Sequence, residues 1–307
     1  MGMRIALNCS RPEHPGTLKN HVTSLALFIV FGLALLYAGI LAMLWAFQER
    51  IVFQPPSGVA PTKVDAMRVE YRASDGVALF AYVVGDCQSD STVLLAFHGN
   101  ADLARWLVPW AAQVVKATGA CVVLPEYRGY DGLSPFASYA ASALDAHAAL
   151  AYVRDTLQIP ASRTVYFGHS LGTAIAAELA AAQPPRSLVL QSPFSTARAM
   201  ASRMFLPGLT LFWRLVSRVH FDTIGRVRAL RVPVWVSHGD RDIIIPVRMG
   251  EEVYAAAAEK GELLIVHGAG HNDVAEVGGD RYWNWLARAI APPAIARNVG
   301  AERRSAP

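Results

Sequence analysis

Residues of the types that act together in nucleophilic catalysis are spread along this sequence. Ser170 lies in the stretch GHSLG, a G-x-S-x-G pattern, and His271 lies in GAGHND. A nucleophilic serine needs a base to accept its proton, and the base needs a carboxylate to orient it. His271 is the candidate base, and the stretch HGDRD offers Asp240 and Asp242 as candidate carboxylates. The chain order Ser, Asp, His predicts an acyl-transfer site.

The elements around Ser170 are those that such a nucleophile requires. Residues 163–168 form an apolar run that predicts a strand, and residues 171–183 predict an alanine-rich helix. Ser170 then lies at a strand-to-helix turn. Gly168 and Gly172 are small enough to let the chain turn tightly and expose the hydroxyl.

Two backbone N–H groups are candidates for an oxyanion hole. The N–H of Leu171 lies at the start of the predicted helix, where the helix dipole favours negative charge. The second donor is expected in the loop after an early strand, where Gly99 would allow close approach and Asn100 would donate. His98 in the same loop could be a second catalytic group, but a histidine that shapes the loop is the favoured interpretation. His238 and His267 lie at strand ends and are interpreted as structural.

Apolar runs alternate with helical patterns over most of the chain. This alternation predicts an α/β fold with a mostly parallel, doubly wound sheet and helices on both faces. A Ser-Asp-Gly turn separates the first two predicted strands. Strands are predicted at 66–71, 77–84, 92–99, 120–129, 163–168, 187–194, 233–240 and 262–271, and helices at 101–118, 138–157, 171–183, 246–260 and 280–290.

The 307-residue chain is 53% hydrophobic and 17% charged, and residues 25–47 contain no charged side chain. A helix over these 23 residues would be about 35 Å long, enough to cross a bilayer. A cleaved signal peptide is the alternative, but the run is long and the residues after it are poor cleavage chemistry. We expect an uncleaved transmembrane signal anchor. Arg4, Arg11 and Lys19 make the N-terminal flank basic, which favours a catalytic domain on the extracytoplasmic side.

The predicted organisation has five parts. Residues 1–24 are a short N-terminal flank, 25–47 the anchor and 48–65 a proline-containing linker. Residues 66–292 form the predicted α/β domain, which contains a longer irregular stretch at 193–232, and residues 293–307 are a polar, basic tail expected to be disordered.

Several kinds of site and partner are not expected. Cys9, Cys87 and Cys121 are too few and too scattered for a disulfide framework or a zinc site, and Cys121 is expected to be a core residue. The sequence has no phosphate loop, dinucleotide fingerprint or H-E-x-x-H motif. We therefore expect no cofactor and no metal. No nucleic-acid-binding module is recognisable, and the oligomeric state stays open.

From about residue 46 to residue 291 the sequence resembles the α/β-hydrolases, and within them the membrane-anchored abhydrolase-domain serine hydrolases. The motifs that carry the resemblance are FQERIVFQPP, FHGNAD, PEYRGY, GHSLGT, SPFST, VSHGDRDIIIP and GAGHND. The resemblance places the nucleophile on Ser170, the acid on Asp242 and the base on His271. Two departures concern the expected pocket rim: Asp131 stands where glycine is common, and Gln191 where glutamate is frequent.

The resemblance implies a membrane-anchored serine hydrolase that cleaves carboxylic esters or thioesters through an acyl-enzyme. The anchor favours small lipid-like or acylated substrates. A serine aminopeptidase-like enzyme on the same fold is one alternative, and a non-catalytic membrane scaffold is another.

The resemblance implies a small helical cap over the site at residues 193–232, and this stretch is strongly basic and carries interleaved aromatic and leucine residues. One interpretation is a solvated surface, and the other is a cap that contacts anionic lipid and receives substrate from the bilayer. Its basic residues are Arg198, Arg203, Arg214, Arg218, Arg226, Arg228 and Arg231, with Asp222 as its one acid.

Overall fold

The computed structural model describes residues 15–58, 64–204 and 217–291 and separates the chain into two units, 1–47 and 48–307. Helix α1 runs over Pro15–Val52, so most of its residues belong to the first unit and residues 48–52 belong to the second. The helix over Asn20–Val52 is long and apolar enough to cross a membrane, and its most apolar window has a mean hydropathy of 2.6. The apolar N-terminal helix therefore fits the expected signal anchor, although it is longer than the predicted span 25–47.

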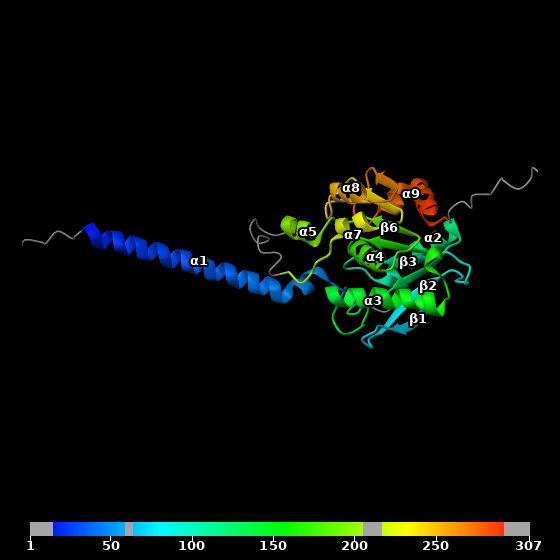
Figure 1. Cartoon of the computed structure of the whole chain (residues 1–307), viewed down its shortest axis with the longest axis horizontal. Coiled ribbons are helices and arrows are strands. Elements are labelled where there is room, and N and C mark those ends of the chain that lie inside the picture. Colours follow the sequence, from blue (N-terminus) through cyan, green and yellow to red (C-terminus); the bar gives the residue numbers. More distant parts are fainter. Residues whose placement is uncertain (1–14, 59–63, 205–216, 292–307) are drawn as a thin grey trace, which may run out of the picture. The chain divides into compact units, whose positions relative to one another are not determined.

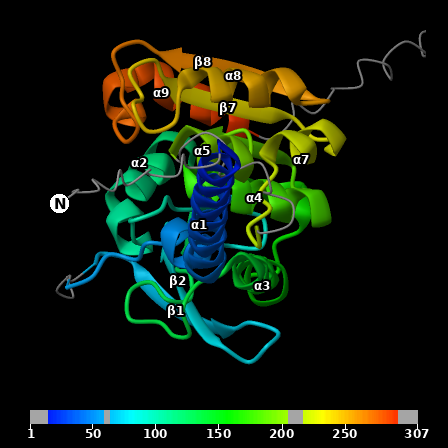
Figure 2. The same cartoon turned by 90° about the vertical axis from the view of Figure 1, so that its left-hand side faces the viewer.

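The second unit is built on one eight-stranded sheet (Figures 1 and 2). The strand order is β1-β2-β4-β3-β5-β6-β7-β8; β1 and β2 pair antiparallel, β2 and β4 pair antiparallel, and the other pairs are parallel. The predicted α/β fold with a mostly parallel sheet is confirmed. The strands are β1 (Met67–Arg72), β2 (Ala78–Val84), β3 (Val93–Phe97), β4 (Cys121–Pro125), β5 (Thr164–His169), β6 (Ser187–Gln191), β7 (Val234–Gly239) and β8 (Lys260–Val266).

Helices cover both faces of this sheet. Figure 2 shows α2 and α9 on the left and α3, α4 and α7 on the right. Two separate hydrophobic clusters match these faces, one containing residues of α2 and α9 and the other residues of α3, α4, α7 and α8. The helices are α2 (Val108–Thr118), α3 (Tyr139–Ala151), α4 (Leu171–Ala182), α5 (Ala197–Met204), α7 (Thr223–Ala229), α8 (Val247–Ala256) and α9 (Val274–Ile290).

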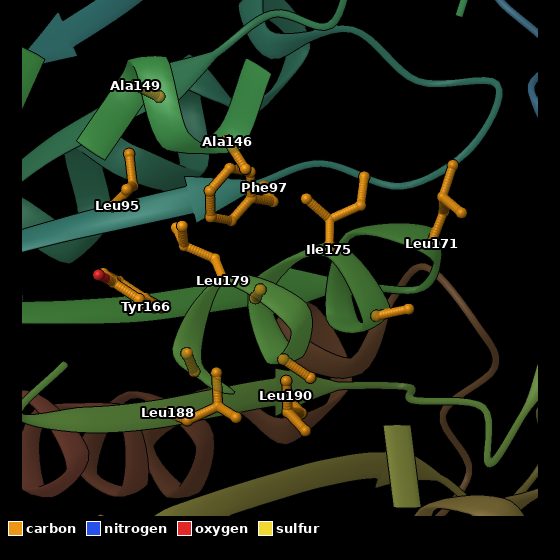
Figure 3. Packing of buried hydrophobic residues seen from close by; sticks show 14 of the residues in the cluster. Leu95, Phe97, Ala146, Ala149, Tyr166, Leu171, Ile175, Leu179, Leu188 and Leu190 are labelled. Atoms are coloured by element: carbon orange, nitrogen blue, oxygen red, sulfur yellow. The ribbon is translucent and has the colours of Figure 1, made fainter. Parts of the chain in front are cut away.

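The alanine-rich composition of α4 follows from its central position. Ile175 and Leu179 are almost fully buried and lie against residues of β3, including Phe97 (Figure 3). Five contiguous buried residues of β3 and five of β5 leave little space between sheet and helix. Small side chains let α4 approach closely, so that its N-terminus, where Ser170 lies, is held firmly at the carboxyl edge of the sheet.

The predicted linker begins differently from the expectation. Residues 48–52 continue α1. Phe53 has 0% exposure and belongs to the hydrophobic cluster that contains residues of α3, α4, α7 and α8. This stretch is not a free connector, because its apolar residues Val52 and Phe53 pack into the core of the second unit. Residues 59–63 of the predicted linker lie outside the described residues.

The expectation for the cysteines is corrected. Cys87 and Cys121 form a disulfide, with their Cα atoms 5.2 Å apart. Val84 pairs with Val122 across the antiparallel strands β2 and β4, so the residues just after β2 lie beside the start of β4. Cys121 is therefore both a buried strand residue and one half of a covalent link.

The predicted cap is described only in part. Helices α5 and α7 flank residues 205–216, which lie outside the described residues together with Arg214. Arg198, Arg203, Arg228 and Arg231 are exposed. Arg226 instead pairs with Glu178 of α4 at 2.8 Å, so this basic residue fixes α7 to the domain. The predicted tail 293–307 is likewise outside the described residues.

Candidate active site

Ser170 lies in the sharp turn between β5 and α4. Its backbone has φ 52° and ψ −116°, a left-handed φ that is uncommon for a residue with a side chain. The turn is held because the Ser170 N–H donates to the Gln191 carbonyl at 3.0 Å and the Ser170 carbonyl accepts from the Thr173 N–H at 3.0 Å. This fixed turn directs the Ser170 hydroxyl toward the carboxyl edge of the sheet.

Gly168 and Gly172 are required by close backbone approach. A Cβ atom on Gly168 would collide with the backbone of Gly172, and one on Gly172 would collide with the carbonyl of Phe97 at the end of β3. Glycine at both positions therefore lets β5, α4 and β3 come together around the turn. This is the physical reason for the G-x-S-x-G pattern in this chain.

The structure brings the predicted base to the predicted nucleophile. His271, in the loop between β8 and α9, has its Nε2 2.9 Å from Ser170 Oγ and its Nδ1 2.7 Å from Asp242 Oδ2. The carbonyl oxygen of His271 accepts from His169 Nε2 at 3.2 Å and from Ser192 Oγ at 3.3 Å. Because Nδ1–H donates to the carboxylate, Nε2 is left with a lone pair that can accept the serine proton.

Asp242 is the carboxylate that reaches His271. Its side chain is fully buried, and Oδ1 accepts from the N–H groups of Ile244 and Ile245, both at 2.8 Å. Burial alone would raise the pKa of Asp242, but hydrogen bonds from His238, His271 and the Ile245 N–H outweigh burial and lower it. Asp242 is therefore ionised over the whole range in which a histidine base operates.

Asp240 is directed elsewhere. Its Oδ2 lies 2.9 Å from His267 Nδ1, and its Oδ1 accepts from the Gly268 N–H at 2.7 Å. The pKa of Asp240 is lowered mainly by the hydrogen bond from His267. Asp240 thus joins the loops after β7 and β8 at the surface, and Asp242 is the one placed against His271.

Two further histidines support the site. His238 was interpreted as structural from the sequence, and His169 was not singled out. His238 is fully buried, and its Nε2 lies 3.1 Å from Asp242 Oδ2 and 2.9 Å from the Ile245 carbonyl. His169, directly before the serine, holds the His271 carbonyl, and loss of hydration lowers its pKa to about 4. The signals were the four-residue spacing of His238 and Asp242 and the position of His169 inside the G-x-S-x-G pattern.

The loop after β3 lies directly against the nucleophile. A Cβ atom on Gly99 would be 3.4 Å from Ser170 Cβ and 3.1 Å from His169 Nδ1. Asn100 follows in this loop, and Leu171 is the first residue of α4, so both predicted donors lie beside Ser170 in the chain or in space. The donor role of these two N–H groups is a prediction.

His98 is engaged away from the nucleophile. Its Nε2 lies 2.8 Å from Glu126 Oε1 and its Nδ1 2.8 Å from the Gly99 carbonyl, and both side chains are buried. Burial opposes protonation, but the neighbouring Glu126 carboxylate raises the pKa of His98. These contacts match a histidine that shapes the loop.

The two departures from the family pattern have local partners. Asp131 has φ 45°, a conformation in which glycine is the usual residue, and its carboxylate pairs with the buried Arg105 at 3.1 Å. Gln191 is buried, and its Oε1 accepts from the Tyr282 hydroxyl at 2.7 Å. The expectation that Gln191 lies on the pocket rim is therefore not met, because its side chain joins a polar contact in the core between β6 and α9.

Metal-ligating residues are not grouped in the described part of the chain. Within residues 15–58, 64–204 and 217–291, no cluster of three or more His, Cys, Asp or Glu side chains is arranged to hold a metal ion.

Comparison with known proteins identifies the family of the fold. Residues 92–211 match the family described as alpha/beta hydrolase fold. An uncharacterized protein of Mycobacterium tuberculosis (strain ATCC 25618 / H37Rv) is 33% identical over 253 residues, which are 81% of this chain and 89% of that protein. The lysophosphatidylserine lipase ABHD12 of Danio rerio is 28% identical over 196 residues, 57% of this chain and 50% of that protein.

Solved structures show the same fold. The Pyrococcus furiosus esterase Pf2001 superimposes with a TM-score of 0.60 at 19% identity, covering 77% of this chain and 99% of the esterase. The chain is a hydrolase that belongs to the α/β-hydrolase superfamily, in its abhydrolase-domain branch.

Proposed function

We propose that this protein hydrolyses carboxylic esters or thioesters through a covalent acyl-enzyme on Ser170. The proposal rests above all on His271, whose two ring nitrogens lie 2.9 Å from Ser170 Oγ and 2.7 Å from Asp242 Oδ2. In the first step His271 Nε2 accepts the hydroxyl proton as Ser170 Oγ attacks the acyl carbon. Asp242 keeps the other ring proton on Nδ1 and stabilises the imidazolium that forms.

The backbone N–H groups of Asn100 and Leu171 stabilise the oxyanion of the tetrahedral intermediate. The intermediate collapses when the leaving group takes the proton from His271. Water then attacks the acyl-Ser170 ester, His271 accepts a proton from it, and a second collapse releases the carboxylic acid and the free serine.

The substrates we propose are lipid-like or acylated molecules. The loop that carries the acid exposes two isoleucines beside the site, with Ile243 86% and Ile244 51% exposed. An exposed apolar pair next to a buried carboxylate is suited to contact an acyl chain. The match to a lysophosphatidylserine lipase and the apolar helix α1 support the same class of substrate.

The catalytic domain is proposed to lie on the extracytoplasmic side of the membrane. The basic flank before α1 favours a cytoplasmic N-terminus. The link between Cys87 and Cys121 is an independent argument, because disulfides persist in oxidising compartments and are rare in the cytosol.

The direct test uses the full-length protein in detergent with a fluorophosphonate probe and a series of p-nitrophenyl esters and acyl thioesters of increasing chain length. We expect labelling and turnover in the wild type and neither above background in Ser170→Ala. Turnover of aminoacyl amides but not of esters would favour the peptidase alternative. A wild type that neither labels nor turns over any substrate would favour the scaffold.

A further inference from the structure

Residues 98–100 form the loop after β3, here called the oxyanion loop because it carries the proposed donor N–H of Asn100. The side chain of Asn100 connects this loop to the residues at the end of helix α1. Its side-chain Nδ2 donates to the carbonyl of Val52, the last residue of α1, at 2.7 Å. Its Oδ1 accepts from the backbone N–H of Gln54 at 2.9 Å. One amide therefore contacts the main chain on both sides of Phe53, across 46 to 48 positions of sequence.

The segment 52–54 is itself fixed, so it can serve as a support. Phe53 has 0% exposure, its N–H donates to the Glu49 carbonyl at 2.7 Å, and its ring packs 6.4 Å from that of Phe221. Glu49 also accepts from the Tyr139 N–H at 3.4 Å through its side chain. The main-chain groups that Asn100 contacts are thus held by the core of the hydrolase domain.

Two tyrosine hydroxyls also hold the loop through hydrogen bonds. The Tyr130 hydroxyl donates to Asn100 Oδ1 at 2.8 Å, and the Tyr127 hydroxyl donates to the His98 carbonyl at 2.9 Å. Gly99 lies between these fixed points and, as described above, directly against Ser170. A shift of this loop would move the Asn100 N–H away from the acyl oxygen without disturbing Ser170, His271 or Asp242.

We propose that the segment 52–54 positions the oxyanion hole, with the Asn100 side chain as the positioning residue that transmits its position to the Asn100 N–H. This inference rests on the proposed acyl-enzyme mechanism, in which that N–H is a donor. The segment 52–54 is thereby part of the catalytic framework of the second unit.

The side chain of Asn100 can be removed while its backbone N–H is retained. We expect Asn100→Ala in the full-length protein to lower kcat for a short p-nitrophenyl ester by about 10- to 100-fold, the range for a misplaced catalytic group. The KM should change by less than about threefold, because the oxyanion forms only in the transition state. The pH dependence of kcat/KM should keep its shape, since the residues around His271 are unchanged.

The partner segment is tested separately at Gln54. Gln54→Pro removes the backbone N–H that donates to Asn100 Oδ1, and it also removes the side-chain hydrogen bond from Gln54 to the Ile51 carbonyl. Gln54→Ala removes only that side-chain hydrogen bond. The difference in kcat between these two variants isolates the backbone donor. Ser57→Pro adds a proline at an exposed position of the same stretch and is the matched control.

A double-mutant cycle decides whether the two sides act through one contact. We expect Gln54→Pro to lower kcat at least fivefold relative to Gln54→Ala, and the combination with Asn100→Ala to fall no further than Asn100→Ala alone. Equal kcat in Gln54→Pro and Gln54→Ala, or a wild-type kcat in Asn100→Ala, would overturn the inference. If Asn100→Ala does not fold, as judged by thermal unfolding, the Gln54 pair alone decides.

Failure of this inference differs from failure of the proposed function. If the wild type turns over esters and labels with fluorophosphonate while Asn100→Ala behaves like it, only the positioning role is wrong. If the wild type neither labels nor turns over esters, the acyl-enzyme mechanism is wrong.

Discussion

Replacing Asp242 by asparagine changes one oxygen into an NH₂ group at a site with four surrounding hydrogen-bond partners. Oδ1 faces the N–H groups of Ile244 and Ile245, so the amide oxygen keeps that place and the amide nitrogen turns toward His271. An NH₂ group next to Nδ1 favours the tautomer with its proton on Nε2. That proton would point at Ser170 Oγ, and His271 could no longer accept the hydroxyl proton.

The expected loss follows from the wrong tautomer of His271, because His238 Nε2 keeps the Ile245 carbonyl as a hydrogen-bond partner. A carboxylate-to-amide change in such a triad lowers kcat by about 10⁴-fold, which corresponds to about 5 kcal/mol of transition-state stabilisation. The assay is the steady-state hydrolysis of a p-nitrophenyl ester by the full-length protein in detergent, with thermal unfolding measured in parallel. KM should change far less than kcat.

Asp240→Asn is the matched control, since Asp240 lies two residues away and binds His267 at the surface. We expect its kcat to stay within about threefold of the wild type. The reasoning would be refuted if Asp242→Asn kept more than a tenth of wild-type kcat, or if Asp240→Asn lost as much.

Three further outcomes are expected. Because the pKa of His169 is lowered to about 4, the unfolded state binds this proton more readily, and stability falls as pH decreases from about 6.5 toward 4. At pH 5 the folded state loses about 2 kcal/mol of stability through this histidine. The Tm of the wild type should therefore fall between pH 7 and pH 5 by about 4–8 °C more than the Tm of His169→Gln, and an equal fall in both proteins would refute this account. Cys87 and Cys121 should resist alkylation in intact cells until a reductant is added, and alkylation without it would argue against an oxidising compartment. In the protein lacking residues 1–47, Arg198→Ala combined with Arg203→Ala should reduce sedimentation with anionic vesicles at low salt while sparing ester turnover. Unchanged sedimentation would show that these arginines form only a solvated surface.

Much of the fold could be predicted because the strands are buried on both faces. Runs such as 93–97 and 121–125 are apolar throughout, which separates them clearly from the helices that follow them. The turn at Ser170 could be predicted because its glycines are demanded by backbone approach rather than by side-chain packing. The relation of Ser170 to His271 and Asp242 followed from the rule that the carboxyl ends of parallel strands share one edge.

The features that were missed depend on contacts between distant segments. The Cys87–Cys121 link requires the antiparallel pairing of β2 with β4, and no local pattern specifies that neighbour. The burial of Phe53 and the contact of Asn100 with Gln54 depend on where the end of α1 meets the oxyanion loop. His238 was left as structural because a histidine at a strand end has many explanations until its distance to Asp242 is known.

The central claim, an acyl-enzyme on Ser170, can be observed directly. Tryptic cleavage after Arg163 and Arg186 yields a peptide of residues 164–186 in which Ser170 is the only serine. The full-length protein is mixed with p-nitrophenyl butyrate, quenched in acid within the burst phase, digested and analysed by tandem mass spectrometry. We predict one butyryl group on Ser170 that disappears on longer incubation and is absent in Ser170→Ala. A butyryl group on a different residue, or full turnover with no acyl group on this peptide, would contradict the account.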